Sequence, residues 1–148
     1  EEQVRAQLKG LLESQKMTEE EAECIRIRDI RRFVESGLGQ RMKKAAMKKH
    51  LYREQPFVIQ RNASMLDDGW KNETVLVQGI IDAYFMEEEE IVLVDYKTDR
   101  VKRGQEQKLI DLYHVQLEDY ARALERMTGK KVKEKIIYSF TLQKEILL

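Results

Sequence analysis

The sequence has few of the residues that would indicate a disulfide scaffold, an iron–sulfur cluster or a flexible linker. Its 148 residues include 1 cysteine, Cys24, which excludes an internal disulfide and any four-cysteine metal or iron–sulfur site within this chain. The 1 proline and 7 glycines argue against long linkers and low-complexity segments. The composition is therefore that of a globular domain.

Long apolar runs and a net charge are also missing. No segment approaches the roughly 18 apolar residues of a membrane-spanning helix, so we expect no membrane association. Residues 1–3 lack the basic and apolar regions of a secretory signal, and we expect a cytoplasmic protein. The 27 basic and 27 acidic residues cancel, so any DNA binding must depend on local patches.

The first third of the chain has the apolar spacing of helices. Helices are predicted over residues 2–13, from the capping box at Thr18 to Glu35, and over residues 38–48. Gly37 suits the left-handed residue that ends the second helix. The last helix carries basic residues that form either a solvated face or a contact with DNA: Arg41, Lys43, Lys44, Lys48 and Lys49.

After residue 50 the pattern changes to that of strands. Residues 51–60 contain Pro56, which indicates an edge strand or an irregular start. Polar residues 62–72, with Trp70, read as a loop or hairpin connection. Adjacent antiparallel strands are predicted over residues 74–86 and 90–97, followed by a basic loop over 99–104. A helix begins soon after this loop, a clear helix runs from about residue 113 to 128 and is closed by Gly129, and a final strand covers 132–142. This order predicts an α/β domain with a mixed sheet, helical over 1–49 and with its core in 50–148.

Two apolar runs contain acidic residues, and the second also contains a lysine. Residues 79–85 include Asp82, and residues 91–98 include Asp95 and Lys97. Residues i and i+2 of a strand point to one side, so Asp95 and Lys97 share a face that Asp82 can join from the neighbouring strand. Two acids and a lysine on one sheet surface are what a divalent metal and an attacking water need.

Each segment alone has a simpler interpretation. Asp82 could be a solvent-facing residue, and Asp95 with Lys97 could be a salt-bridged strand end. Together they favour a metal site, and their hard oxygen ligands suit Mg²⁺ or Mn²⁺ better than Zn²⁺. The Tyr96 backbone carbonyl could supply a further oxygen. Lys97 would help to deprotonate a water or stabilise developing phosphate charge.

These motifs resemble those of the PD-(D/E)XK nuclease superfamily. More narrowly, the chain resembles the RecB-type nuclease domain at the C-terminus of AddA-type helicase–nuclease subunits. The segments that carry the resemblance are residues 53–57, 79–82, 94–100, 116–124 and 133–140. The resemblance implies a restriction-endonuclease-like α/β fold, in which a mixed sheet is flanked by helices, with extra N-terminal helices and a single nuclease domain over residues 1–148.

The resemblance also implies site residues. Asp82 and Asp95 correspond to the metal ligands, and Lys97 corresponds to the catalytic lysine. Gln116 and Tyr120 correspond to helix residues that face the site, and their spacing of four puts them on one helix face. The alternative for these two is the polar edge of an amphipathic helix.

Residues outside this group are less closely tied to the motifs. Glu54 resembles a glutamate on the first strand of the fold, which lies near the metal or pairs with the basic loop. Arg100, Lys102 and Arg103 follow the lysine motif, and they either hold DNA phosphates or form a solvated face.

One expected motif is missing. RecB-type nucleases usually carry a Gly-Thr-x-x-His motif on an N-terminal helix, and its histidine is a further metal ligand. His50 and His114 do not stand in that context, so we interpret both as surface or packing residues. The resemblance therefore implies an N-terminally truncated fragment with an incomplete metal shell, which need not be active in isolation.

The implied function is that of a metal-dependent DNA exonuclease domain in an AddAB-type helicase–nuclease. It would use Mg²⁺ or Mn²⁺ to hydrolyse phosphodiester bonds of single-stranded DNA during double-strand break repair. Its partners would be single-stranded DNA ends, the helicase domains of the parent chain and an AddB-like subunit. The alternatives are a free-standing phage-type exonuclease or resolvase, and a catalytically inert module of the same fold that binds DNA or a partner.

Overall fold

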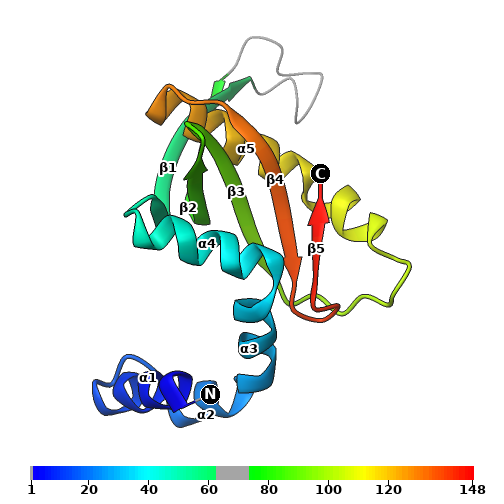
Figure 1. Cartoon of the computed structure of the whole chain (residues 1–148). Helices are drawn as coiled ribbons and strands as arrows, with labels where there is room; N and C mark the ends of the chain where they lie inside the picture. The colour runs from blue at the N-terminus through cyan, green and yellow to red at the C-terminus, as the bar shows by residue number, and fades with distance from the viewer. Residues whose placement is uncertain (1, 63–73) are drawn as a thin grey trace. The chain divides into compact units, whose positions relative to one another are not determined.

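The computed structural model describes residues 2–62 and 74–148 of the chain (Figure 1). These residues form two compact units, Glu1–Arg41 and Met42–Leu148, with the boundary inside a helix. The prediction that the whole chain is a single nuclease domain stays a prediction. In the described part of the chain, no helix has both the length and the apolar character needed to cross a bilayer.

The first unit consists of short helices. They are α1 (Glu2–Glu13), α2 (Glu19–Cys24), α3 (Ile27–Glu35) and the start of α4 (Gly37–Met47). The prediction of one helix from Thr18 to Glu35 was wrong, because it is interrupted after α2. The Ile25 N–H donates to the Ala22 carbonyl in a tighter turn, and Arg26 is then extended with ψ 97. Neither glycine nor proline marks this break.

The junction between α3 and α4 also differs from the prediction. Gly37 is not a left-handed end residue but the first residue of α4. Ser36 is extended, and its hydroxyl accepts a hydrogen bond from the Gly39 N–H at 3.1 Å, which satisfies one of the free amides at the start of a helix. The serine therefore acts as the cap of α4, and no left-handed glycine is required.

The second unit is built on a mixed sheet of five strands in the order β1-β2-β3-β4-β5. The pairs β1–β2, β2–β3 and β4–β5 are antiparallel, and β3 and β4 pair in parallel. The strands are β1 (Leu51–Asn62), β2 (Thr74–Glu87), β3 (Glu90–Lys97), β4 (Val132–Ser139) and β5 (Lys144–Leu147), and α5 (Gln107–Thr128) connects β3 to β4. The predicted α/β class with a mixed sheet flanked by helices is confirmed.

Several boundaries can be compared with the sequence pattern. The strand with Pro56 lies at the edge of the sheet, and Gly129 ends α5 with φ 69, both as predicted. The helix predicted to begin soon after residue 104 begins at Gln107, and it is continuous with the clear helix predicted from residue 113. Strand β5 was not predicted, because a run of four residues carries little periodicity. Trp70 and most of the predicted loop around it lie outside the described residues.

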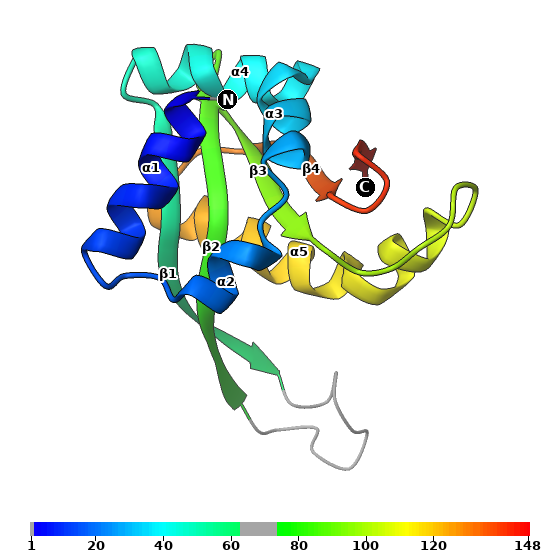
Figure 2. The ribbon, with the colours of Figure 1, turned by 90° about the horizontal axis from the view of Figure 1, so that it is seen from below.

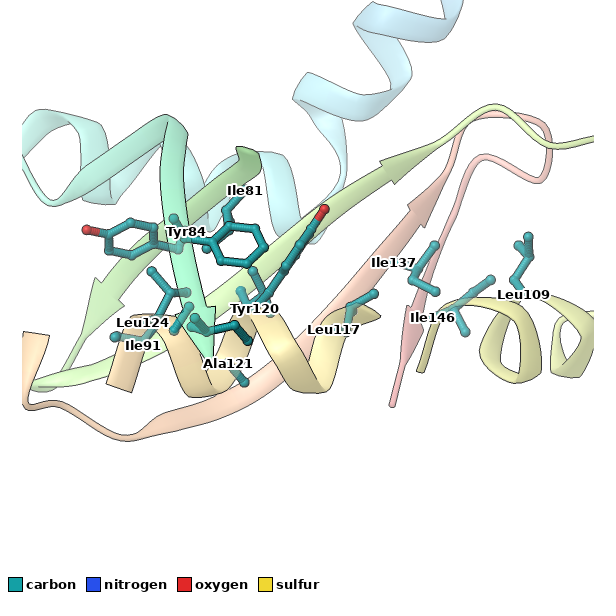
Figure 3. Close-up of a cluster of buried hydrophobic side chains, with 14 residues drawn as sticks. Ile81, Tyr84, Ile91, Leu109, Leu117, Tyr120, Ala121, Leu124, Ile137 and Ile146 are labelled. Carbon is teal, nitrogen blue, oxygen red and sulfur yellow. The ribbon is translucent and has the colours of Figure 1, made fainter. Parts of the chain in front are cut away.

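Helices cover both faces of the sheet (Figure 1). On one face, α5 contacts β1, β3 and β4, and its apolar side chains point toward the strands. The buried cluster between them includes Ile81, Ile91, Leu117, Leu124 and Ile137 (Figure 3). On the other face, the hydroxyl of the β3 residue Tyr96 lies 3.7 Å from the Met42 sulfur of α4. The end of β3 is thus held from both sides.

The alternation of side chains along β2 breaks near Asp82. Ile81 and Tyr84 both belong to the cluster beneath α5, although residues three apart should point to opposite faces of a regular strand. The neighbouring strand is irregular at the same level, because Glu54 has φ 49 and the ladder omits the pair between Arg53–Ala83 and Gln55–Ile81. This irregularity lies at Asp82, the first acidic residue of the predicted site.

A buried ion pair ties β1 to α5. Arg61 Nη1 donates to Asp119 Oδ2 at 2.9 Å, and the side chains are 13% and 8% exposed. The Arg61 Nε is buried and has no hydrogen-bond partner within residues 2–62 and 74–148. The far ends of β1 and β2 reach beyond the other strands (Figure 2), and this pair ties the end of β1 to the helix.

The packing of α5 predicts the effect of shortening its side chains. Leu117 is fully buried, so Leu117→Ala should lower the free energy of unfolding by about 2–5 kcal/mol through lost burial and a residual cavity. Leu112 on the same helix is 64% exposed, and Leu112→Ala should change it by less than about 0.5 kcal/mol. Urea denaturation of both variants tests this prediction, and equal losses would contradict it.

Candidate active site

The acidic residues of β2 and β3 meet where the two strands separate. The ladder between these strands ends at the pair Ala83–Val94, one residue before Asp82 and Asp95 would pair. Beyond it, Asp82 Oδ2 accepts a hydrogen bond from the Tyr96 N–H at 2.8 Å. The Asp82 carboxylate thus accepts the hydrogen bond that a backbone carbonyl would accept in a continued ladder. This bond satisfies the Tyr96 amide and fixes the direction of the Asp82 side chain.

Asp95 is buried at the end of β3, with 2% of its surface exposed. Burial raises the pKa of its carboxyl, the Lys97 ammonium opposes that rise, and the negative charges of Asp82 and Asp99 add to it. Asp95 Oδ2 forms an ion pair with Lys97 Nζ at 2.7 Å, and no further hydrogen bond to this oxygen is found within residues 2–62 and 74–148. In this part of the chain, a single ammonium therefore balances the buried carboxylate.

Lys97 is held from the side of α5. Its Nζ donates to Gln116 Oε1 at 3.2 Å, and it lies 4.1 Å from the centroid of the Tyr113 ring. The side chain is 15% exposed, so the ammonium is largely removed from water. Lys97 therefore has an anion, an amide oxygen and an aromatic face around it.

A hydrogen-bond chain continues from Lys97 along the helix. Gln116 Nε2 donates to the Tyr120 hydroxyl at 2.8 Å, and the Tyr120 ring packs edge-on against Phe57 at a centroid distance of 5.1 Å. Burial raises the pKa of the Tyr120 hydroxyl, and the charges of Asp95 and Asp82 raise it further. The predicted group of Asp82, Asp95, Lys97, Gln116 and Tyr120 is brought together by these contacts.

Tyr96 stands between the two acids but points its ring away from them. The ring packs at 6.0 Å from that of Phe140, and burial raises the pKa of the hydroxyl to about 12. Its amide serves Asp82, whereas the predicted role of its carbonyl stays a prediction. The side chain thus belongs to the packing of the opposite face.

Glu54 is not brought into a three-carboxylate group. Its side chain is exposed, and no three His, Cys, Asp or Glu side chains within residues 2–62 and 74–148 are arranged to hold a metal ion. Of the predicted acidic ligands, this leaves Asp82 and Asp95, whose role as metal ligands stays a prediction. Mg²⁺ is commonly held by one or two carboxylates with waters and substrate phosphates completing its shell, so two donors are consistent with such a site.

The basic loop after β3 is exposed as predicted. Arg100, Lys102 and Arg103 all have exposed side chains in the segment between Lys97 and α5. His114 is also exposed, with its Nδ1 3.1 Å from the Asp111 carbonyl, and His50 is exposed at the end of the loop after α4. Both histidines thus have the surface positions expected for them.

Two residues of the site, Tyr113 and Asp99, were not predicted from the sequence. Tyr113 contacts Lys97 and donates its hydroxyl to Asp99 Oδ1 at 2.9 Å. The signal was present, because Tyr113 precedes Gln116 by three residues and shares its helix face. The helix pattern alone does not show that this face meets Lys97, because that contact depends on the tertiary packing of α5 against β3.

Comparison with known proteins agrees with this geometry. The family model of the PD-(D/E)XK nuclease superfamily matches residues 1–146. The AddA-type subunit of the ATP-dependent helicase/nuclease of Clostridium novyi (strain NT) is 39% identical over 150 residues, which cover 98% of this chain and 12% of that protein. The proteins of the same name from Thermoanaerobacter sp. (strain X514) and Acetivibrio thermocellus are 42% and 43% identical over 93% and 94% of this chain.

The relatives are much longer than the matched segment. The chain spans 11% to 12% of their length, so the similarity concerns one region of them. The resemblance to AddA-type subunits noted from the sequence motifs is confirmed by these matches. Because the family model covers nearly every residue, the chain belongs to the PD-(D/E)XK nuclease superfamily.

Proposed function

We propose that this chain is the nuclease domain of an AddAB-type helicase–nuclease, and that it hydrolyses phosphodiester bonds of single-stranded DNA with Mg²⁺ or Mn²⁺. The observation that carries the proposal is the convergence of two acids and a lysine at the end of β3. The buried Asp95 carboxylate forms an ion pair with Lys97 at 2.7 Å, and burial together with the negative charges of Asp82 and Asp99 raises the pKa of its carboxyl. Two carboxylates this close disfavour each other's negative charge unless a cation offsets it.

The donors fit a hard divalent cation. PD-(D/E)XK nucleases generally use divalent metal ions, and the carboxylates of Asp82 and Asp95 are oxygen ligands of the kind that Mg²⁺ and Mn²⁺ prefer. Asp82 already uses Oδ2 for the Tyr96 amide, which leaves Oδ1 available to an ion. When bound, the cation would polarise the phosphate and lower the pKa of a water.

The remaining chemistry belongs to the chain's own residues. Lys97 presents a positive charge beside Asp95, where it can orient a water or offset the negative charge that develops on the phosphate. Gln116 fixes the ammonium through Oε1 and orients the Tyr120 hydroxyl through Nε2. Because the pKa of Tyr120 is raised, its hydroxyl keeps its proton and can donate to a phosphate oxygen.

Contact with DNA would be made by charge rather than by base recognition. Arg100, Lys102 and Arg103 are exposed in the loop that follows Lys97, where they could hold the phosphates of an entering strand. Such contacts carry no sequence information, so cleavage would be largely independent of sequence. Within the native protein, the strand would be supplied by helicase domains acting with an AddB-like subunit during double-strand break repair.

The metal assignment predicts a selective loss of binding. Titration calorimetry with Mn²⁺ should show binding to the wild-type chain and none to Asp95→Asn, because the variant lacks the buried anionic oxygen. Asp111→Asn is a matched control, since that acid is exposed on α5, where its Oδ1 accepts a hydrogen bond from the Gln107 side-chain amide. Equal binding by the wild type and the Asp95 variant, or no binding by either, would refute the assignment.

The assignment of Lys97 predicts a loss of catalysis. In the full-length native protein, Lys97→Ala should slow cleavage of labelled single-stranded DNA by about 10²-fold or more, because a positive charge facing the phosphate is removed. Lys108→Ala, which removes an exposed lysine from α5, should leave the rate unchanged. Unchanged cleavage by the Lys97 variant would instead support an inert module that binds DNA or a partner.

The raised pKa of Asp95 predicts a pH dependence of stability. The folded chain holds this proton more tightly than the unfolded chain does, so its stability falls as the pH rises above the ordinary carboxyl value of 3.8. Without metal and near neutral pH, Asp95→Asn should therefore raise the melting temperature, and this advantage should shrink as the pH falls. Thermal unfolding in chelator across pH tests this. A growing advantage at low pH would show that the Lys97 ion pair outweighs burial.

A further inference from the structure

The position of the Lys97 ammonium is a physical problem that the chain must solve. A lysine side chain is flexible, and its charge is a strongly hydrated point at the end of four carbons. In the proposed reaction, the cation and Lys97 would both be attracted to Asp95, so binding of the cation weakens the hold of Asp95 on the ammonium. Contacts that do not depend on Asp95 must therefore hold the ammonium, and the single hydrogen bond to Gln116 Oε1 is one of them.

We propose that Tyr113, oriented by Asp99, is a positioning residue that holds the Lys97 ammonium beside Asp95 through its aromatic face. The inference rests on the proposed nuclease function and adds a residue to it. Lys97 Nζ lies 4.1 Å from the centroid of the Tyr113 ring, well within the roughly 6 Å over which a ring attracts a cation. Because the lysine side chain is 15% exposed, little water weakens this attraction.

The ring is itself fixed at both ends. Its backbone lies in α5, one turn before Gln116, which is the other residue of that helix in contact with Lys97. Its hydroxyl donates to Asp99 Oδ1 at 2.9 Å, and Asp99 follows Lys97 by two residues. The end of β3 and the helix are thereby linked through one tyrosine, and the pKa of its hydroxyl is raised by burial and by Asp99.

An aromatic face suits this task better than a second carboxylate would. A carboxylate would neutralise the ammonium, accept its protons and compete for the cation. The π face attracts the positive charge without accepting a proton, so the charge of Lys97 stays available to a water or a phosphate. The position of the ammonium is then set by Gln116 and Tyr113, and Asp95 is free to serve the cation.

The test is a series of replacements at residue 113 in the full-length native protein, measured as kcat and KM on labelled single-stranded DNA. Tyr113→Phe keeps the ring, Tyr113→Leu removes it, and pentafluorophenylalanine keeps its shape but reverses the charge of its face. We expect kcat to fall by roughly five- to thirtyfold for the last two and much less for Phe, with KM little changed. Tyr52→Leu, a half-exposed tyrosine of β1, is the control and should leave kcat unchanged.

The possible outcomes separate the inference from the function on which it rests. Wild-type kcat in the fluorinated variant would overturn the inference, because a ring needed only for packing is insensitive to the charge of its face. Loss of cleavage in Lys97→Ala together with no effect in the series would overturn the inference and leave the proposed function standing. Full cleavage in both Lys97→Ala and Asp95→Asn would overturn the function and the inference together.

A second measurement does not require activity. A proton that lies above an aromatic ring is shifted upfield in its NMR spectrum. In the wild-type chain, the methylene protons next to Lys97 Nζ should show this shift. In Tyr113→Leu they should lose it, while the other resonances keep their positions and show that the variant is folded. Lysine protons at their ordinary position in the wild type would overturn the inference.

Discussion

The Asp95 carboxylate lies at the end of a buried strand, where the Lys97 ammonium 2.7 Å away is its ionic neighbour. Burial raises the pKa of the Asp95 carboxyl, and the opposing effect of Lys97 does not cancel this rise. The charged form of the carboxyl is therefore disfavoured. The surrounding structure holds both groups in place despite that cost. Asp82 is fixed by the Tyr96 amide, and α5 brings Gln116 and Tyr113 against Lys97. The geometry of the whole site depends on this buried ion pair between Asp95 and Lys97.

Such an arrangement trades stability for readiness to bind a cation. A chain selected only for stability would replace the buried pair of Asp95 and Lys97 with apolar side chains of similar volume, because no charge would then have to be removed from water. The two halves of the site have different supports. The acids lie on paired strands, whereas the residues that direct the lysine lie on a helix packed across the same face (Figure 3). Relative movement of helix and sheet would therefore disturb Lys97 before it disturbed the acids.

Much of this geometry could be predicted from the sequence because it follows from strand alternation. The spacing of Asp95 and Lys97 puts them on one face, and the adjacent hairpin strand brings Asp82 to the same level, as the structure has it. The site geometry that escaped prediction depends on tertiary contacts. Tyr113 shares a helix face with Gln116, but no local pattern reveals that its ring meets Lys97 or that its hydroxyl meets Asp99.

The errors in the fold have a similar cause. The break after α2 contains neither glycine nor proline, so the helical spacing continued through it without a signal. Ser36 rather than Gly37 determines the next junction, because a cap is recognised only once the helix it begins is known. Nothing in the sequence indicates that the alternation of side chains between the two faces of β2 breaks between Ile81 and Tyr84, beside Asp82. Local sequence patterns thus predicted the helices and strands better than the positions where these elements are interrupted or irregular.

The ion pair between Arg61 and Asp119 places a constraint on how this family can vary. Each side chain is nearly enclosed, so losing one partner would strand the other charge away from water at a cost of about 3–5 kcal/mol. Exchanging both for apolar residues of similar volume would cost far less, because no charge would remain to be solvated. Evolution at these two positions should therefore proceed by paired replacement, and a lineage that carries only one of the charges should be rare.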